Sequence, residues 1–450
     1  MARTKKEAAL TPEERLQAAL VPDWEWPYKL PENWCWTTVG AINQYEGISA
    51  DPTKAKNETF ELYSVPSSAD NYPEIVLGAD IGSAKQSVKK GDVLLCKINP
   101  RINRVWKVSK YTDHSLLASS EWIVIRNSRL ISNYLMWCLR SPYFRGYMLS
   151  NVSGVGGSLM RAQPKFVQGY PIPVPPLAEQ QRIVDRIENL FVKLDEAKEK
   201  AQAVVDSFET RKAAILHKAF TGELTAKWRE EHDVGMESWE HHQFSDLCAI
   251  VRGGSPRPAG DPRYYDGNIP FMKVADITRN DSPYVSKVEY SIKEEGLKKT
   301  RMVEENTLLL TNSGATLGVP AITTIRTTFN DGIAAFIGLD IDSLLFYYYF
   351  WTSKTAFLRS INMGAAQPNL NTKLIGEVEI DVPQTAERVE IARVLNALLS
   401  EEQQAKEAAE AVLDQIDLMK KSILARAFRG ELGTNDPSEE SAMELLKRVL

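Results

Sequence analysis

Basic side chains crowd one short stretch of this 450-residue chain, between residues 85 and 110. A single acid, Asp92, interrupts them, and Trp106 and Tyr111 lie among or beside them. Cations interleaved with aromatic residues on a strand-loop-strand pattern suit contacts with nucleic-acid phosphates. A solvated surface explains the same charges, so both interpretations stay open. The cations are Lys85, Lys89, Lys90, Lys97, Arg101, Arg104, Lys107 and Lys110.

No other group of residues forms a catalytic pattern. Residues 281–284 read Asp-Ser-Pro-Tyr and predict a turn, and the glycines at 154–157 lack the strand-loop-helix context of a phosphate cradle. His232, His241 and His242 are of a type that binds metals, but their polar surroundings indicate a solvated linker. We therefore expect no catalytic residue and no metal site.

Bulk composition is that of an ordinary globular protein with room for roughly three folded units. Net charge is −5, so the overall charge argues neither for nor against a nucleic-acid partner, and only local clusters of charge are informative. The four widely spaced cysteines fit a reducing cytosol. The most apolar stretch, residues 344–351, is far shorter than the ~20 residues of a membrane span. We expect a cytoplasmic protein with no membrane partner.

The strongest pattern is an internal repeat, which must position any functional residues. Residues 174–224 recur without a gap as residues 382–432, and twenty-one aligned pairs are identical. Both copies show an apolar spacing of four and three residues, which is typical of a coiled coil. Each copy ends at a glycine, Gly222 or Gly430, as a helix stop. Some forty residues in a helix extend ~60 Å.

Neither helix can bury its apolar stripe alone, so we expect the two helices to form an antiparallel pair within one chain. Pairing of each helix with another molecule is the alternative. The predicted seam of the first helix comprises Ile183, Ile187, Leu190, Leu194, Ala197, Ala201, Val204 and Phe208. That of the second comprises Ile391, Leu395, Leu398, Ala405, Ala409, Val412 and Ile416.

Short apolar runs separated by glycine and polar turns precede each helix and indicate two strand-rich domains. Both domains also contain a predicted helix, at residues 134–148 and 344–358. A short helix starts at Thr11, and another follows Asp436-Pro437, taken as its cap; both should dock on this chain or on a partner. The predicted segments are 1–29 for docking, 30–173 for domain 1, 174–224 for spacer helix 1, 225–381 for a linker and domain 2, 382–432 for spacer helix 2, and 433–450 for docking.

The helix sequences resemble those of the specificity subunits of type I restriction-modification systems. The resemblance covers the whole chain as an order of domains. At the second helix start, residues 384–388 depart from the family pattern without changing the register. The motifs that carry the resemblance are Pro175-Pro176-Leu177-Ala178-Glu179-Gln180-Gln181-Arg182-Ile183, Ala213 through Arg229, and Ser422 through Leu432.

The resemblance implies an α+β, pseudo-two-fold protein in which two target-recognition domains are joined by an antiparallel, intramolecular coiled coil. Each domain would read one half of a split double-stranded DNA site, and the helix pair would set the gap. Such subunits carry no catalysis and bind no cofactor. Two methyltransferase subunits bind them and use S-adenosylmethionine, and added restriction subunits use ATP and magnesium.

Loop residues with planar or bidentate donors are the candidate DNA readers, because such groups distinguish base edges in the major groove. The glycines at 253 and 254 would let the backbone approach DNA closely. The candidates are Lys97, Asn99, Arg101, Arg104 and Arg161 in the first domain, and Arg252, Ser255, Arg257, Arg263, Lys273, Asn312, Asn369 and Asn371 in the second.

Two other functions remain possible from the sequence. One is a self-contained modification or cleavage enzyme, against which the missing cofactor and metal motifs count. The other is a coiled-coil scaffold whose end domains bind proteins. Strong salt dependence of DNA affinity, and competition by one particular split duplex, would separate a DNA reader from a scaffold.

Overall fold

The computed structural model describes residues 11–154, 160–360 and 370–450. These residues form two compact units. Unit 1 contains residues 1–201 and 411–450, and unit 2 contains residues 202–410. The division runs through both long helices, whereas the sequence analysis placed its boundaries at the helix ends. Each unit therefore contains one strand-rich domain and one part of each long helix.

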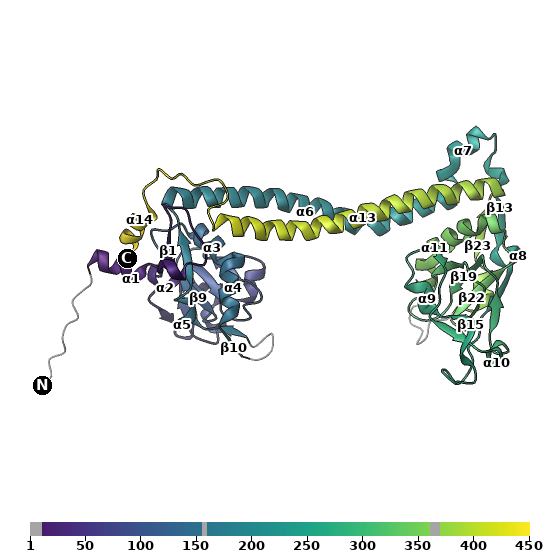
Figure 1. Ribbon diagram of the computed structural model, residues 1–450, viewed down its shortest axis with the longest axis horizontal. Coiled ribbons are helices and arrows are strands. Elements are labelled where there is room, and N and C mark those ends of the chain that lie inside the picture. Colours follow the sequence, from purple (N-terminus) through teal and green to yellow (C-terminus); the bar gives the residue numbers. More distant parts are fainter. Residues whose placement is uncertain (1–10, 155–159, 361–369) are drawn as a thin grey trace. The chain divides into compact units, whose positions relative to one another are not determined.

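The strand-rich domain of unit 1 contains four sheets (Figure 1). The largest has five strands in the order β2-β5-β8-β3-β4, and a three-stranded sheet has the order β7-β6-β9. β1 pairs with β12, and β10 pairs with β11. The strands are β1 (Cys35–Thr38), β2 (Ser49–Ala50), β3 (Thr59–Tyr63), β4 (Glu74–Leu77), β5 (Lys85–Ser87), β6 (Val93–Cys96), β7 (Val105–Lys107), β8 (Ser115–Ala118), β9 (Trp122–Ile125), β10 (Val152–Ser153), β11 (Arg161–Ala162) and β12 (Pro171–Val174).

The helix expected at residues 134–148 is two helices, because Pro142 cannot continue the first one. Ser141 caps the second helix by accepting a hydrogen bond from the Phe144 amide at 3.2 Å. The short helices of unit 1 are α1 (Pro12–Ala19), α2 (Val39–Ile42), α3 (Ser132–Arg140), α4 (Pro142–Ser150), α5 (Pro164–Val167) and α14 (Ala442–Val449).

The two short terminal helices pack against each other on the core of unit 1. Leu16 of α1 and Leu446 of α14 are buried in one cluster, and the Arg15 side chain donates to the Leu450 carbonyl at 3.1 Å. The capping box expected at Thr11 is confirmed. The expected cap of α14 is wrong: Ser441 caps that helix, and Asp436-Pro437 forms part of the preceding turn.

Unit 2 has a five-stranded sheet in the order β14-β22-β19-β20-β16, a four-stranded sheet in the order β17-β15-β21-β18, and the pair β13-β23. Its strands are β13 (Glu240–Gln243), β14 (Ala249–Arg252), β15 (Tyr265–Met272), β16 (Tyr284–Val285), β17 (Tyr290–Ile292), β18 (Arg301–Val303), β19 (Thr307–Thr311), β20 (Pro320–Thr323), β21 (Thr327–Phe329), β22 (Ile333–Ile337) and β23 (Glu379–Val382). Its short helices are α7 (Ala226–Glu231), α8 (Phe244–Leu247), α9 (Val274–Thr278), α10 (Glu294–Leu297), α11 (Leu344–Ser360) and α12 (Thr372–Gly376).

The aromatic stretch at residues 344–351 is the first half of α11 and belongs to the core of unit 2. Phe346 and Trp351 are fully buried there. Among the residues that the model describes, no helix is long and apolar enough to cross a membrane.

The two repeat copies form the long helices α6 (Leu177–Phe220) and α13 (Thr385–Ala427) (Figure 1). In unit 1, Lys198 pairs with Asp417 at 3.4 Å and Lys420 pairs with Asp195, so the helix segments run antiparallel. In unit 2, Arg211 pairs with Glu402 at 2.7 Å in the same sense. The expected antiparallel pairing within one chain is therefore confirmed.

The seam expected on α6 is buried or partly buried throughout, whereas the seam expected on α13 holds only in part. Ala405 and Val412 are exposed, Val412 by 40%, and the following residues, Lys406 and Leu413, are less exposed. A helix with 3.6 residues per turn drifts by ~20° per heptad against a strict seven-residue repeat. The buried stripe therefore shifts by one residue at these two positions, whereas Ala409 and Ile416 are buried as expected.

A buried glutamate fixes the start of α6 in unit 1. Glu179 has no exposed surface; its carboxylate accepts hydrogen bonds from Thr434 at 2.7 Å and from the Arg182 guanidinium at 2.9 Å. Arg182 also pairs with Glu439 at 2.8 Å. Burial raises the pKa of Glu179, and the hydrogen bonds oppose that rise. The glutamate thus ties the chain that follows α13 to the beginning of α6.

The equivalent glutamate, Glu387, does the same at the start of α13 in unit 2. It is fully buried and pairs with Arg229 at 2.5 Å. It also accepts hydrogen bonds from Thr225 at 2.7 Å and from the Trp239 indole at 3.1 Å. The threonine in each case follows a helix-stopping glycine in the left-handed conformation, with φ of 79° at Gly222 and 73° at Gly430. We call each such arrangement a glutamate clamp.

Glu387→Gln should destabilise unit 2 by about 2–4 kcal/mol, because it leaves the nearly buried Arg229 without its counter-charge. Hydrogen exchange should be faster in the variant at the start of α13 and in residues 222–229, where the contacts of Glu387 are lost. Glu390→Gln, which removes a partly exposed ion pair with Arg393 three residues along, is the matched control and should cost less than about 0.5 kcal/mol. Equal effects of the two substitutions would contradict the clamp.

Candidate nucleic-acid interface

Most predicted readers of unit 1 gather around the loop of residues 97–104, which joins β6 to β7. β11 pairs with this loop: the Asn99 amide donates to the Met160 carbonyl at 2.8 Å, and the Ala162 amide donates to the Lys97 carbonyl at 2.8 Å. Asn99 has a φ of 44°, a left-handed conformation that asparagine tolerates. Arg161 on β11 is thereby brought beside Lys97.

One carboxylate holds these two cations together. Glu121, in the turn directly before β9, lies 3.2 Å from the Arg161 guanidinium and 3.9 Å from the Lys97 ammonium. Lys97 also donates to the Ser120 carbonyl at 2.7 Å. Arg161 keeps about half of its side chain exposed, at 51%. Arg101 is exposed at the loop tip, so both arginines can reach an external ligand.

The remaining cations of the stretch at residues 85–110 do not form one patch. Lys85 lies on β5 of the five-stranded sheet, whereas Lys107 lies on β7 of the three-stranded sheet. Lys107 donates to Asn133 at 2.6 Å, and Lys110 pairs with Asp113 at 2.9 Å. Arg104 is half-buried, and its carbonyl accepts from the Cys96 amide. The exposed cations that gather in one place are therefore those at the loop tip and on β11.

Three of the predicted readers of unit 2 lie around Asp331, two residues before β22. Its carboxylate accepts a hydrogen bond from Ser255 at 2.5 Å and lies 3.6 Å from Arg257, while Arg252 donates to the Asp331 carbonyl at 2.6 Å. Burial disfavours the charged carboxylate, but the hydrogen bond from Ser255 and the positive charges of Arg257 and Arg252 outweigh it, so the pKa of Asp331 is lowered. Arg257 keeps 71% of its side chain exposed.

A cavity of 270 Å³ opens beside this cluster. Ser255, Arg257 and Lys273 line it together with Asp331 and the aromatic Tyr290. The Lys273 ammonium lies 3.1 Å from the centre of the Tyr290 ring. A hollow with cations, a carboxylate and aromatic faces has the donors and acceptors needed to receive part of a polar ligand.

Three other predicted readers are buried or make contacts within their own domain. Asn312 is completely buried at the end of β19, so it presents no amide to an external ligand. Asn371 is exposed, but its side-chain oxygen caps α12 by accepting from the Leu374 amide at 2.8 Å. Arg263 pairs with Asp261 at 2.6 Å, which lowers the pKa of Asp261 to about 2. Asn369 lies outside the described residues.

The glycines at 253 and 254 have a role in packing within the domain, and their expected close approach to DNA stays a prediction. A Cβ on Gly253 would lie 2.2 Å from the Asn330 carbonyl oxygen, and one on Gly254 would lie 2.3 Å from the Lys299 carbonyl oxygen. These glycines are required because the loop packs against the domain's own backbone. Packing of the loop in this way fixes the positions of Ser255 and Arg257.

The carboxylates of the two clusters occupy equivalent places in their sheets, although the cations beside them lie on different loops. In unit 1, β6 lies between β7 and β9; in unit 2, β19 lies between β20 and β22, with antiparallel pairing throughout. Glu121 and Asp331 each occupy the turn before the third of these strands. Neither carboxylate was predicted from the sequence, because the pairing of residues 24 to 79 positions apart depends on the fold.

The histidines do not form a metal site. His232 stacks on Trp228 with 4.1 Å between ring centroids, while His241 pairs with Asp381 at 2.8 Å and His242 with Glu240 at 3.3 Å. The hydrogen bond with Asp381 raises the pKa of His241. Within residues 11–154, 160–360 and 370–450, no group of three or more histidine, cysteine or acidic side chains could hold a metal ion.

Comparison with known proteins places this arrangement in a family. The model of the type I restriction modification DNA specificity domain matches residues 38–205 and again residues 236–411. The two matches cover more than half of the chain, and each contains one of the clusters described above. The chain therefore belongs to the family of type I restriction-modification DNA specificity proteins.

Individual relatives agree with this assignment. The chain is 26% identical to the StySPI specificity subunit of Salmonella potsdam over 321 residues, which is 68% of this chain and 67% of the relative. It is 23% identical to the EcoKI specificity subunit of Escherichia coli K12 over 354 residues, or 72% and 73% of the two chains. The crystal structure of an HsdS subunit from Thermoanaerobacter tengcongensis has the same fold, with a TM-score of 0.66 at 22% identity, covering 91% of this chain and all of that one.

Asp331→Asn should loosen the loop that carries Ser255 and Arg257 and remove a negative charge from the cluster. If the cluster binds DNA, we expect about tenfold less preference for the specific duplex over a random duplex, together with tighter non-specific binding. Fluorescence anisotropy at a fixed salt concentration measures the affinities for the specific and the random duplex. Hydrogen exchange of residues 252–258 shows whether the contacts of Asp331 still hold the loop in place.

Asp266→Asn is the matched control for this substitution. Asp266 lines the same cavity and is exposed, and asparagine tolerates its φ of 59°. It removes the same charge without removing a hydrogen bond to the loop. An equal loss of preference in both variants would mean that charge alone matters and that Asp331 positions nothing.

Proposed function

We propose that this chain reads a two-part site on double-stranded DNA, with one half read by each domain. The observation that carries the proposal is the pair of carboxylates in equivalent turns, Glu121 and Asp331, each beside exposed arginines. Glu121 orients Arg161, near the exposed Arg101, and Asp331 orients Arg257, although these arginines lie on different loops of the two domains. Arginine contacts guanine edges in the major groove with two hydrogen bonds, so oriented arginines suit base reading better than mobile lysines do.

The helix pair sets the gap between the two half-sites in this proposal. An α-helix rises 1.5 Å per residue and B-DNA about 3.4 Å per base pair, so a coiled coil of fixed length fixes how many base pairs stay unread. The resemblance between the two repeat copies supports this role, because equal helices give each reader the same attachment.

Two methyltransferase subunits are the proposed protein partners, with restriction subunits added in the full complex. The helix segments of unit 1 support a partner surface: Val192 is 57% exposed, Leu418 63% and Met419 48%. Large apolar side chains exposed together on helices mark sites of protein interaction. We assign the chemistry to the partners, which would use S-adenosylmethionine, ATP and magnesium, and no catalysis or cofactor binding to this chain.

Arg101→Ala and Arg257→Ala test whether each domain reads one half of the DNA site. The complex with methyltransferase subunits would be used to select bound duplexes from a random library. We expect each substitution to relax one half of the selected site and to leave the other half intact, at a cost of about 1–3 kcal/mol in affinity. The two substitutions should relax opposite halves.

Arg129→Ala and Arg279→Ala are the controls, since both arginines are exposed in the same domains but lie outside the clusters. They should leave the selected site unchanged. A uniform loss of affinity in the two cluster variants, with no change in the selected bases, would show phosphate contacts instead of base reading. No selected motif at all would favour the alternative of a coiled-coil scaffold with protein-binding end domains.

A further inference from the structure

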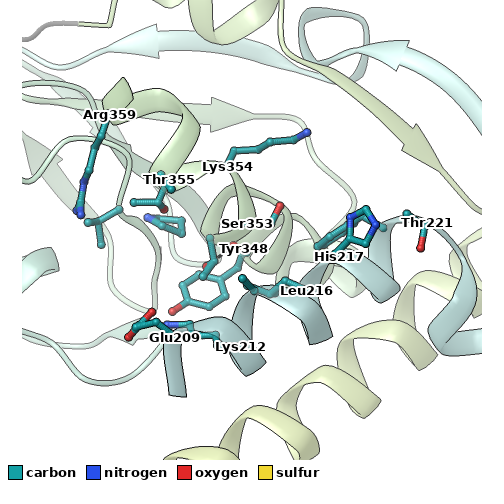
Figure 2. A pocket seen from close by; sticks show the side chains of 16 residues that line it. Glu209, Lys212, Leu216, His217, Thr221, Tyr348, Ser353, Lys354, Thr355 and Arg359 are labelled. Carbon is teal, nitrogen blue, oxygen red and sulfur yellow. Dashed lines mark hydrogen bonds between the residues drawn. The ribbon is translucent and has the colours of Figure 1, made fainter. Parts of the chain in front are cut away.

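A groove of 810 Å³ lies in unit 2 between the C-terminal part of α6 and α11 (Figure 2). Leu216 and Phe220 of α6, with Val319 and Pro320 at the start of β20, give it apolar walls. Phe220 is anchored by ring contacts with Phe346 at 5.4 Å and with Phe350 at 5.5 Å. The volume lies within the range of ~300–1,000 Å³ that is usual for ligand sites.

Three cations, one histidine and one acid line this groove. Lys212 and His217 come from α6, and Lys354 and Arg359 come from α11, whereas Glu209 is the single carboxylate (Figure 2). In the described part of the chain, none of the four basic residues belongs to an ion pair. Lys354 lies over the Phe350 ring at 5.2 Å, and the Arg359 Nε donates to the Leu317 carbonyl at 3.1 Å.

The repeat explains why Lys212 has no acidic partner. Its equivalent in the second copy, Lys420, pairs with Asp195 inside unit 1. The equivalent of Asp195 is Gln403, which carries no charge. Because glutamine stands at position 403 in place of the aspartate, Lys212 has no acidic partner on α13. It lies at the edge of a groove that holds three other basic residues.

In the corresponding region of unit 1, aromatic side chains of the chain pack against one another. Phe428, the equivalent of Phe220, packs on Tyr134 with ring centroids 5.4 Å apart, and Trp137 packs on Phe191 at 5.1 Å. In that domain the helix breaks at Pro142, whereas α11 continues to Ser360. The longer α11 supplies the second wall of the groove.

We propose that this groove docks an acidic amphipathic helix of another protein. The two helical walls and the apolar residues between them suit the apolar face of a third helix, and the three cations suit carboxylates on its flanks. Phe357, which is 54% exposed on α11, extends the apolar surface beyond the groove. DNA phosphates would use the cations but gain nothing from Leu216 and Phe220, so a helical partner fits the walls better. The inference does not rest on DNA reading.

A fluorescein-labelled helical peptide of eighteen residues tests the proposal, with leucines every third or fourth position and glutamates on both flanks. Anisotropy would measure its affinity for the full chain, for Lys212→Glu/Lys354→Glu and for the control Lys298→Glu/Lys299→Glu, whose lysines are exposed elsewhere in unit 2. We expect binding to the unaltered chain and the control, and at least tenfold weaker binding to the groove variant. A peptide with lysines in place of the glutamates should prefer the groove variant.

Three results would overturn the proposal. The first is no binding, or equal binding by the unaltered chain and the groove variant. The second is equal binding of a peptide whose leucines are replaced by serines, and the third is displacement of the peptide by random duplex DNA at equal charge concentration. The last two would identify the groove as a general anion site. Unchanged thermal melting of the groove variant excludes loss of folding as a cause.

Discussion

Two fully buried glutamates, Glu179 and Glu387, fix how each long helix begins and how the chain leaves the other one. A buried carboxylate is costly unless hydrogen-bonded and paired, and each is satisfied by an arginine and by a threonine that follows a helix-stopping glycine. The helix ends therefore cannot move independently of the turns beside them. Since the strand-rich domains continue directly into these helices, the clamps also fix where each domain attaches.

The same principle recurs on a smaller scale in the candidate DNA-contact clusters. Glu121 and Asp331 hold cations that would otherwise sample many rotamers, and they do so from equivalent turns in two domains with little sequence in common. An ordered arginine loses less entropy on binding than a free one. The carboxylate also repels phosphates, so a cluster of this kind favours ligands with a matching pattern of donors and acceptors over any polyanion.

Periodicity and helix stops were readable from the sequence because they are local. The antiparallel helices, the glycines at their ends and the capping box at Thr11 follow from spacing alone. The errors also concern local features: Ser441 caps α14 in place of Asp436, Pro142 ends a helix that was predicted to continue, and the 3.6-residue helical repeat turns Val412 out of the seam.

Among the candidate readers, residue type indicated which side chains could contact DNA but could not reveal burial. Asn312 is the clearest case, because nothing local distinguishes a buried amide from an exposed one. The most direct test of the account deletes residues 200–206 and 408–414, which are equivalent in the repeat, and maps methylated adenines when the chain is co-expressed with methyltransferase subunits. Seven helical residues span ~10.5 Å, or about three base pairs. The account predicts the same two half-sites with a gap about three base pairs shorter than that of the undeleted chain. An unchanged gap, or methylation at a site with only one specified half, would contradict it.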